Sequence, residues 1–168
     1  MIACSRWLQR AAVRFVKDVR GLNLLPPFEK VEILQRTHPE KSYAVLDEMV
    51  LHVETLIQPL ELPYRILRLC GGDMGFTSAL TSDVEVGSAA QERWLEVSSV
   101  SNMESYQTSR LKCRFKDASG KTQLAHSLNG SSLALPRILA SILENNQTEN
   151  GIKIPQVLHK YFGAEIIS

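Results

Sequence analysis

The chain of 168 residues has the length of a single domain, and its 44% hydrophobic and 22% charged residues are ordinary for a globular protein. With 19 Lys and Arg against 18 Asp and Glu, its net charge is +1, so no overall field recruits nucleic acid and any such contact has to be local. No stretch is long and apolar enough to cross a membrane.

The first sixteen residues carry several cations and no acid. Arg6, Arg10 and Arg14 are four residues apart, which predicts one basic face of an amphipathic helix. Basic, acid-poor, amphipathic starts are typical of organelle transit peptides. A solvated terminal helix or an altered start is the favoured interpretation, because the residues that follow look like the middle of a domain. The sequence thus predicts an atypical segment over 1–16 and a domain over 17–168.

A strand is predicted directly after a break. Two prolines close the segment "LNLLPP" (22–27), which fits neither a helix nor a central strand. The following residues, 28–35, alternate in polarity, which predicts a strand with Phe28, Lys30 and Glu32 on one face. That face carries an aromatic ring, a cation and an anion in a row.

A long helix follows, which His38-Pro39 begins and Pro59 ends. Its apolar residues recur at steps of three and four and predict one buried face: Tyr43, Leu46, Met49, Val50, Val53, Leu56 and Ile57.

The rest of the chain reads as strands in hairpins with one further long helix. We expect strands over 64–70, 80–86, 93–102, 111–116 and 122–128, a glycine-rich loop over 71–78, a helix over 132–146 and a turn of helix at Pro155. Strands in hairpins with few long helices indicate an α+β fold on an antiparallel sheet.

The helix over 132–146 poses a question at its start. Ile138, Leu139, Ile142 and Leu143 recur at helical spacing and predict a buried face. Proline suits the first turn of a helix, but a permanent cation, Arg137, follows it at once.

Cysteine usage indicates a reducing compartment. Cys4, Cys70 and Cys113 are far apart and odd in number, so they fit neither a disulfide framework nor the spacing of a metal site. We therefore expect structural thiols and a cytoplasmic protein.

Glycine patterns for a dinucleotide fold or a P-loop are absent. Taken in order, however, several segments resemble the C-terminal part of the seryl-tRNA synthetase family of class II aminoacyl-tRNA synthetases. They are "KDVRGLN", "FEKVE", "LPYRILRLCGGDMGFTSALTSDVEV", "RWLEVSSVSN", "LKCRFKD", "GKTQLAHSLNGSSLALPRILASILENNQ" and "IKIPQVL". The resemblance runs from about Lys17 to the end, and "GDMGF", "EVSSVSN" and "NGSSLALPR" are its most specific blocks.

This resemblance implies a class II catalytic core and an ATP-dependent ligase of protein biosynthesis. The family joins serine to ATP, releases pyrophosphate from seryl-adenylate and passes the seryl group to tRNA(Ser). Its partners are therefore serine, ATP with Mg²⁺ and tRNA(Ser), and its members are homodimers with no membrane association. The family's N-terminal helical arm and its first motif, which builds the dimer, have no counterpart in this sequence.

The resemblance also implies roles on the ATP side. Arg137 matches the arginine that grips the γ-phosphate, which a planar, forked cation suits. Phe28 matches the ring that stacks on adenine. Glu96 and Ser99 match the pair that holds Mg²⁺ on the phosphates. Arg137 and Glu96 are thus the implied catalytic residues. The structural alternatives are an arginine that pairs with an acid under the helix, a core phenylalanine and polar hairpin residues.

On the serine side, Glu32 matches the carboxylate that binds the substrate ammonium. Asn129 and Ser131 resemble a short polar loop that recognises the substrate hydroxyl. Required hydrogen bonds to that hydroxyl would reject alanine strongly. The structural alternatives are a strand charge on the surface, and an N-cap and turn.

The second motif of the family is altered here. Leu8, Gln9 and Ala11 stand where its Phe, Arg and Glu belong, Leu24 replaces an expected arginine, and prolines occupy 26–27. Loss of a charge-stabilising group of this kind costs about 10²- to 10³-fold in rate. The expectation is a serine–tRNA ligase with impaired activity. A non-catalytic binding or partner protein on the same fold and a decayed fragment stay open as alternatives.

Overall fold

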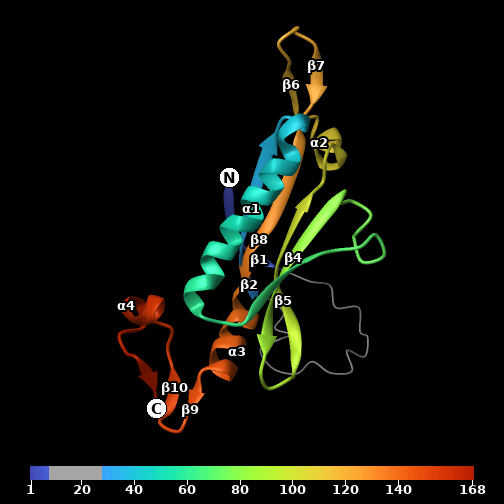
Figure 1. The fold of residues 1–168 in the computed structure, drawn as a ribbon. Coiled ribbons are helices and arrows are strands. Elements are labelled where there is room, and N and C mark those ends of the chain that lie inside the picture. The colour runs from blue at the N-terminus through green and yellow to red at the C-terminus, as the bar shows by residue number, and fades with distance from the viewer. Residues whose placement is uncertain (8–27) are drawn as a thin grey trace.

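The computed structural model describes residues 1–7 and 28–168, and its centre is an antiparallel sheet (Figure 1). In the described part this sheet has six strands in the order β1-β2-β8-β5-β4-β3. They are β1 (Ile2–Trp7), β2 (Phe28–Thr37), β3 (Tyr64–Arg68), β4 (Leu80–Ser88), β5 (Arg93–Asn102) and β8 (His126–Ala134). The α+β fold on an antiparallel sheet is confirmed.

Two helices, α1 (Ser42–Ile57) and α3 (Leu135–Asn145), pack on the sheet and close one hydrophobic core. The core takes residues from both helices, four strands and the segment that follows α1: Ile33, Leu46, Met49, Val53, Ile57, Leu60, Leu62, Val84, Val86, Leu95, Val97, Val100, Leu128, Leu133, Ile138 and Ile142. Alternation along the strands leaves the other face of the sheet to polar residues.

The buried face of α1 is confirmed in its centre and differs at two positions. Leu46, Met49 and Val53 are buried, whereas Tyr43 and Leu56 are 46% and 37% exposed. The hydroxyl of Tyr43 donates to the carboxylate of Glu104 at 2.7 Å, which keeps this ring at the edge of the core. Two short 3-10 turns flank the helix, η2 (Pro39–Lys41) and η3 (Gln58–Leu60).

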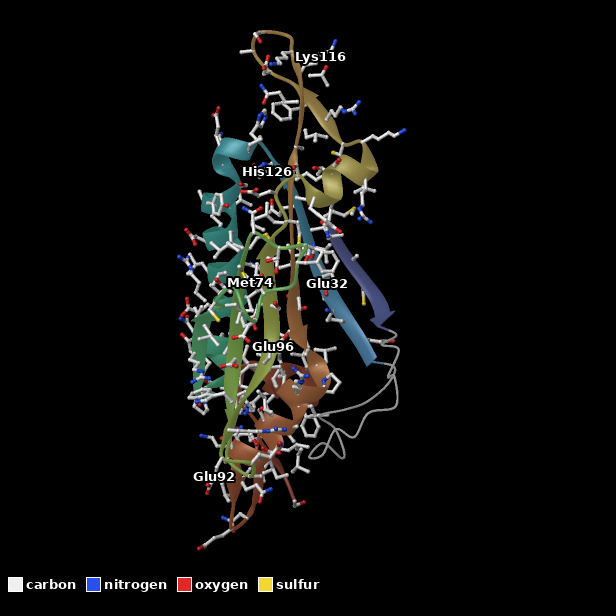
Figure 2. All side chains as sticks on the ribbon, turned by 90° about the vertical axis from the view of Figure 1, so that its right-hand side faces the viewer. Glu32, Met74, Glu92, Glu96, Lys116 and His126 are labelled. Carbon is white, nitrogen blue, oxygen red and sulfur yellow. The ribbon has the colours of Figure 1, made fainter. Side chains whose placement is uncertain are left out.

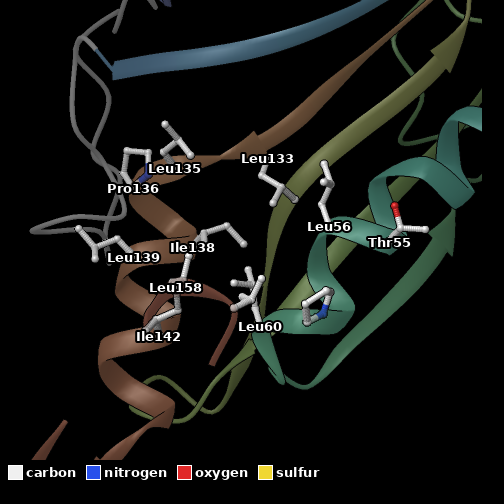
Figure 3. Close-up of a pocket in the computed structure, with 12 residues that line it drawn as sticks. Thr55, Leu56, Leu60, Leu133, Leu135, Pro136, Ile138, Leu139, Ile142 and Leu158 are labelled. Atoms are coloured by element: carbon white, nitrogen blue, oxygen red, sulfur yellow. The ribbon is translucent and has the colours of Figure 1, made fainter. Parts of the chain in front are cut away.

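Helix α3 begins three residues later than expected, because β8 continues to Ala134. Ile138 and Ile142 are buried, as the spacing predicts, but Leu139 is 48% exposed. Leu139 lines an apolar cavity of about 730 Å³ between the end of α1 and the first turns of α3 (Figure 3).

The N-terminal residues are not helical where the structure describes them. Ile2–Trp7 forms β1, an antiparallel edge strand paired along β2 from Ile2↔Ile33 to Trp7↔Phe28. The helical interpretation is therefore wrong for these residues, because the open edge of β2 supplies partners for backbone N–H and C=O groups. Arg10 and Arg14 lie outside the described residues.

Two smaller sheets lie at opposite ends of the molecule (Figure 1). One is the hairpin β6 (Arg114–Lys116) and β7 (Thr122–Leu124), next to an unexpected short helix, α2 (Tyr106–Leu111). The other consists of β9 (Gln147–Thr148), β10 (Gly151–Lys153) and β11 (Ile166–Ile167), with the turns η4 (Gln156–Leu158) and α4 (His159–Phe162) between the last two strands. The turn of helix expected at Pro155 is confirmed.

Candidate functional site

An irregularity in β5 places two of the predicted site residues on one face. Residues three apart on a regular strand point to opposite faces. Here Glu96 pairs with Glu85 and Ser99 pairs with Asp83, so β5 has one residue more than β4 between these pairs. This extra residue is a β-bulge, which returns Ser99 to the face of Glu96.

A second bulge lies in β8. Lys30 pairs with Ala134 and Glu32 pairs with Ser131, so β8 has one residue more than β2 between the pairs. Leu133 takes up this residue with φ of +73°, a left-handed conformation that is uncommon outside glycine. The bulge turns the end of β8 towards α3 and leaves Ser131 opposite Glu32.

The residues on the predicted serine side meet on this face. Lys30 forms an ion pair with Glu32, and its Nζ donates to Oγ of Ser131 at 2.9 Å. Oγ of Ser131 lies 3.2 Å from Oε1 of Glu32. The side chains of Lys30 and Glu32 are 14% and 21% exposed, so a cation, an anion and a hydroxyl form one cluster at the surface of the sheet.

Asn129 stands apart from this cluster. Its Nδ2 donates to Oε1 of Gln107 at 3.4 Å, and Oγ of Ser127 donates to the same oxygen at 2.9 Å. Asn129 and Ser131 lie in the central strand β8, so the loop that the sequence suggested for them is wrong. Small polar residues are tolerated there because β2 and β5 satisfy the backbone on both sides.

Arg137 lies in the first turn of α3, next to the proline that the helix accepts at its N-terminus. Its Nη1 donates to the backbone carbonyl of Glu96. Among the described residues it forms no ion pair, so the alternative of an acid under the helix finds no support. The arginine is therefore tied to the strand that carries Glu96, and its other guanidinium donors have no hydrogen-bond partner among the described residues.

Two carboxylates of this face have raised pKa values. Burial raises the pKa of Glu96, and the charge of Asp83 raises it further, while Arg137 and Lys30 oppose the shift. Burial raises the pKa of Asp83 more than a hydrogen bond from Ser99 lowers it. Both carboxylates therefore hold their protons more tightly than free side chains do, as expected for acids gathered in one place.

Asp83 also has an unusual environment. It is only 8% exposed, and its Oδ1 has no hydrogen-bond partner among the described residues. The neighbouring acid Glu85 is paired with Nε of Arg65 at 2.5 Å. Asp83 thus brings an uncompensated oxygen to the wall beside Ser99, which is costly unless a ligand uses it.

The structure leaves part of the predicted site undescribed. Phe28 is the first residue of β2, but its side chain is outside the described part, so its stacking role stays a prediction. The altered second motif, from Leu8 to the prolines at 26–27, lies in the undescribed segment as well.

Two candidate residues were missed by sequence reasoning. Lys30 could have been found, because alternation along β2 already places it beside Glu32. Asp83 could not, because its position beside Ser99 depends on the register between β4 and β5.

The donors present suit a hard cation. Glu96 and Ser99 offer oxygen ligands of the kind that Mg²⁺ prefers, and the free oxygen of Asp83 lies next to them. In residues 1–7 and 28–168, no three His, Cys, Asp or Glu side chains converge into a metal site. A magnesium ion here would therefore need ligand phosphates to complete its coordination.

Comparison with known proteins places this face in context. Residues 10–146 match the family model of the tRNA synthetase class II core domain (G, H, P, S and T). The chain belongs to this family. The antiparallel sheet, with the polar cluster on the face opposite α1 and α3, is thus part of a class II synthetase core.

The curated relatives that the chain matches are serine–tRNA ligases. The chain is 49% identical over 164 residues to a serine–tRNA ligase of Neisseria gonorrhoeae (strain NCCP11945). This alignment covers 97% of this chain and 38% of the relative. It is 51% identical over 157 residues to the serine–tRNA ligase of Salinibacter ruber, covering 92% of this chain and 37% of the relative. The chain therefore spans little more than a third of the length of these relatives.

Two of the similar solved structures are also seryl-tRNA synthetases. Seryl-tRNA synthetase from Pyrococcus horikoshii, complexed with ATP, superposes with a TM-score of 0.92 at 34% identity, covering 99% of this chain and 38% of that one. Cytoplasmic serine–tRNA ligase from Naegleria fowleri, in complex with AMP, gives 0.88 at 30% identity, covering 98% and 40%. A prolyl-tRNA synthetase from Giardia lamblia, at 13% identity and a TM-score of 0.80, shares the fold alone.

Within the described residues, no helix combines the length and the apolar character needed to cross a membrane.

Proposed function

We propose that this core binds serine and ATP with Mg²⁺ and forms seryl-adenylate, the first step of tRNA(Ser) charging by a serine–tRNA ligase. The observation that carries the proposal is the cluster of Glu32, Lys30 and Ser131 on the same open face as Glu96 and Arg137. An anion for the ammonium and cations for carboxylate and phosphate are what this reaction requires.

On the serine side, the carboxylate of Glu32 binds the substrate ammonium and Ser131 bonds the substrate hydroxyl. Lys30 neutralises Glu32 in the absence of substrate, and its ammonium turns towards the substrate carboxylate once the substrate amine has taken its place beside Glu32. Asn129, held by Gln107, supports the strand beside Ser131. Such positioning converts a two-molecule step into one between held partners.

On the ATP side, Phe28 stacks on the adenine and Arg137 binds the γ-phosphate. A serine carboxylate oxygen attacks the α-phosphorus, the bond from phosphorus to the bridging oxygen breaks, and pyrophosphate leaves with the electron pair. Charge grows on the phosphate oxygens in this step, and the guanidinium, already fixed to the Glu96 carbonyl, stabilises it without rearrangement.

Magnesium, held by Glu96, Ser99 and phosphate oxygens, would neutralise the charge that develops on the leaving pyrophosphate. Asp83 keeps Ser99 in place by accepting its hydrogen bond. The transfer to tRNA(Ser), assembly as a homodimer and a cytoplasmic location belong to the same proposal.

Serine-dependent exchange of pyrophosphate into ATP tests the proposal directly. We expect exchange above background in the folded chain, and a loss of about 10²-fold or more in Arg137→Ala, because a phosphate-binding cation is removed. Arg93→Ala is the matched control, since Arg93 is exposed and contacts Gln91 away from this face. Exchange that survives in Arg137→Ala would contradict the assigned role.

A second function is favoured by the altered second motif. With Gln9 where the family has an arginine, the chain would bind ATP and serine without turnover. Isothermal titration separates the two functions: heat with ATP–Mg²⁺ but no exchange supports the binding protein. No heat with ATP–Mg²⁺ or a seryl-adenylate analogue contradicts both.

A further inference from the structure

A group of cations gathers on the hairpin β6–β7 and on the end of α2 that leads into it. We call this group the basic ribbon; it comprises Arg110, Lys112, Arg114, Lys116 and Lys121. All five side chains are exposed, and residues 110–124 contain one acid, Asp117. In a chain with almost equal numbers of cations and acids, this is a strong local excess of positive charge.

The charge of the basic ribbon is not neutralised by neighbours. None of its five cations forms an ion pair within residues 1–7 and 28–168. Asp117 is occupied by the turn, since Oδ1 accepts from Oγ and N of Ser119 and from N of Lys121, and Oδ2 accepts from Nε2 of Gln123. These bonds lower the pKa of Asp117 and hold the turn that sets the spacing of the cations.

The hairpin is braced on one face and open on the other. The ring of Phe115 packs edge-on against His38, with centroids 4.1 Å apart. Because side chains alternate along a strand, Arg114 and Lys116 point away from this contact. The backbone of Cys113 is hydrogen-bonded to both Thr108 and Ala125, which fixes the base of the hairpin to α2 and to the residue that joins β7 to β8.

An exposed aromatic side chain is linked through Tyr106 to Arg110, the first cation of the basic ribbon. Phe76, in the glycine-rich loop, is 89% exposed, an unusual state for phenylalanine. Its ring meets the ring of Tyr106 edge-on, with centroids 6.0 Å apart. The guanidinium of Arg110 in turn lies 4.9 Å from the centroid of the Tyr106 ring. A flat ring open to solvent, on the same surface as a row of cations, is the arrangement with which proteins hold single strands.

We propose that the basic ribbon and Phe76 bind single-stranded RNA, with phosphates along the cations of the hairpin and a base stacked on the Phe76 ring. That the polyanion is RNA rests on the proposed function, in which tRNA is the second substrate. The hairpin lies away from the adenylate site: Figure 2 places Lys116 at one end of the molecule, and Glu32 and Glu96 further down the sheet, with Met74 of the Phe76 loop nearer to Glu32. Phosphate binding on the hairpin is thus separable from chemistry at Glu96.

The test is fluorescence anisotropy with a labelled single-stranded RNA of twelve nucleotides, titrated at several salt concentrations. The variant Lys112→Gln/Arg114→Gln/Lys116→Gln removes three phosphate contacts. We expect its affinity to fall by at least about 10-fold in 0.1 M salt, and the slope of log affinity against log salt to fall by about 2. Phe76→Ala should weaken binding by about 5-fold or more without changing that slope, because stacking releases no counterions.

The matched control, Arg93→Gln/Lys153→Gln/Lys160→Gln, removes the same charge from exposed positions at the opposite end of the molecule. It should leave affinity nearly unchanged. Equal weakening by the control would reduce the effect to net charge and overturn the proposal. If RNA binding is insensitive to Phe76→Ala and heparin or anionic vesicles bind equally tightly, the surface is a general polyanion surface and the proposal is overturned. Absence of RNA binding would also overturn the proposal.

Pyrophosphate exchange is measured on the same samples. The ribbon variants should retain the exchange of the unaltered chain, so a failure of RNA binding and a failure of adenylate formation are seen separately.

Discussion

Asp83 is the residue whose burial has the clearest consequence for stability. Its pKa is raised, mainly by burial, so the folded state holds this proton more tightly than the unfolded state does. The resulting stability is fully present below the unfolded value, near pH 4, and is lost as the pH rises through the folded value. At neutral pH a buried charge with one unpaired oxygen therefore costs free energy.

We predict that Asp83→Asn raises the free energy of unfolding at pH 7 by roughly 1 kcal/mol, because the buried charge disappears. The gain should shrink as the pH falls through the folded pKa of Asp83. Urea unfolding at a series of pH values measures both. A destabilised variant at pH 7 would show that the charge is compensated in the native state.

Asp117 provides a control, because its pKa is shifted in the direction opposite to that of Asp83. Its pKa is lowered, first by the hydrogen bond from Ser119, so its contribution to stability is present above the unfolded value and is lost as the pH falls through the folded value. Asp117→Asn should therefore destabilise the hairpin at pH 7 and leave stability unchanged in acid.

At the level of the elements, the contact between β8 and β5 depends on a glycine. Gly130 pairs with Val100 in these strands, and a Cβ on Gly130 would lie 3.0 Å from Cγ2 of Val100. Val100 is completely buried, so it has no free space to move into. The two strands that carry Ser131 and Glu96 approach closely for this reason.

Gly130→Ala should consequently destabilise the fold by about 1–3 kcal/mol, the usual cost of overpacking a buried site. Thermal unfolding by circular dichroism measures it. Gly75→Ala is the control, since a Cβ there meets nothing within 4 Å, and it should change stability by less than about 0.5 kcal/mol. Equal effects at both positions would rule out the close strand contact as the cause.

The bulges of β5 and β8, like the contact at Gly130, depend on how paired strands meet. Each adds one residue to a strand, and together they bring Ser99 to Glu96 and leave Ser131 opposite Glu32. The family motifs place these residues in one site, but spacing alone would separate Glu96 from Ser99. A regular strand over 93–102 was predicted correctly as an element, while its irregularity was not predictable from local alternation.

On the scale of the whole molecule, an apolar cavity of about 730 Å³ lies between α1 and α3 (Figure 3). Its walls include Leu56, Leu135 and Leu139, all of which are partly exposed. The predicted faces of both helices fail at Leu56 and Leu139 because these residues border the cavity instead of the core.

We expect this cavity to bind a hydrophobic dye such as anilinonaphthalene sulfonate. Leu139→Lys should reduce the dye fluorescence several-fold and change stability by less than about 0.5 kcal/mol, because the residue is already half exposed. Leu51→Lys, at a 59% exposed position of α1 outside the cavity, should leave dye binding unchanged. Loss of dye binding in both variants would point to general surface charge.

The sequence by itself determined the family, the α+β class and the type of most elements. These follow from local patterns: alternation over 28–35, helical spacing from Leu46 to Ile57, and the motif blocks around Glu96 and Arg137. Local patterns failed at the N-terminus: the four-residue spacing that begins at Arg6 predicted a helix, but residues 2–7 pair as an edge strand. An edge partner outweighed the periodicity there.

Only the tertiary structure decided what lies beside what. Asp83 reaches Ser99, Lys30 bridges Glu32 and Ser131, and Arg137 reaches the Glu96 carbonyl through strand register and two bulges. These contacts join segments up to 101 residues apart, so no local window contains them. Sequence periodicity reports which face a side chain occupies, whereas the register of paired strands, set by the packing of the whole core, reports its neighbours.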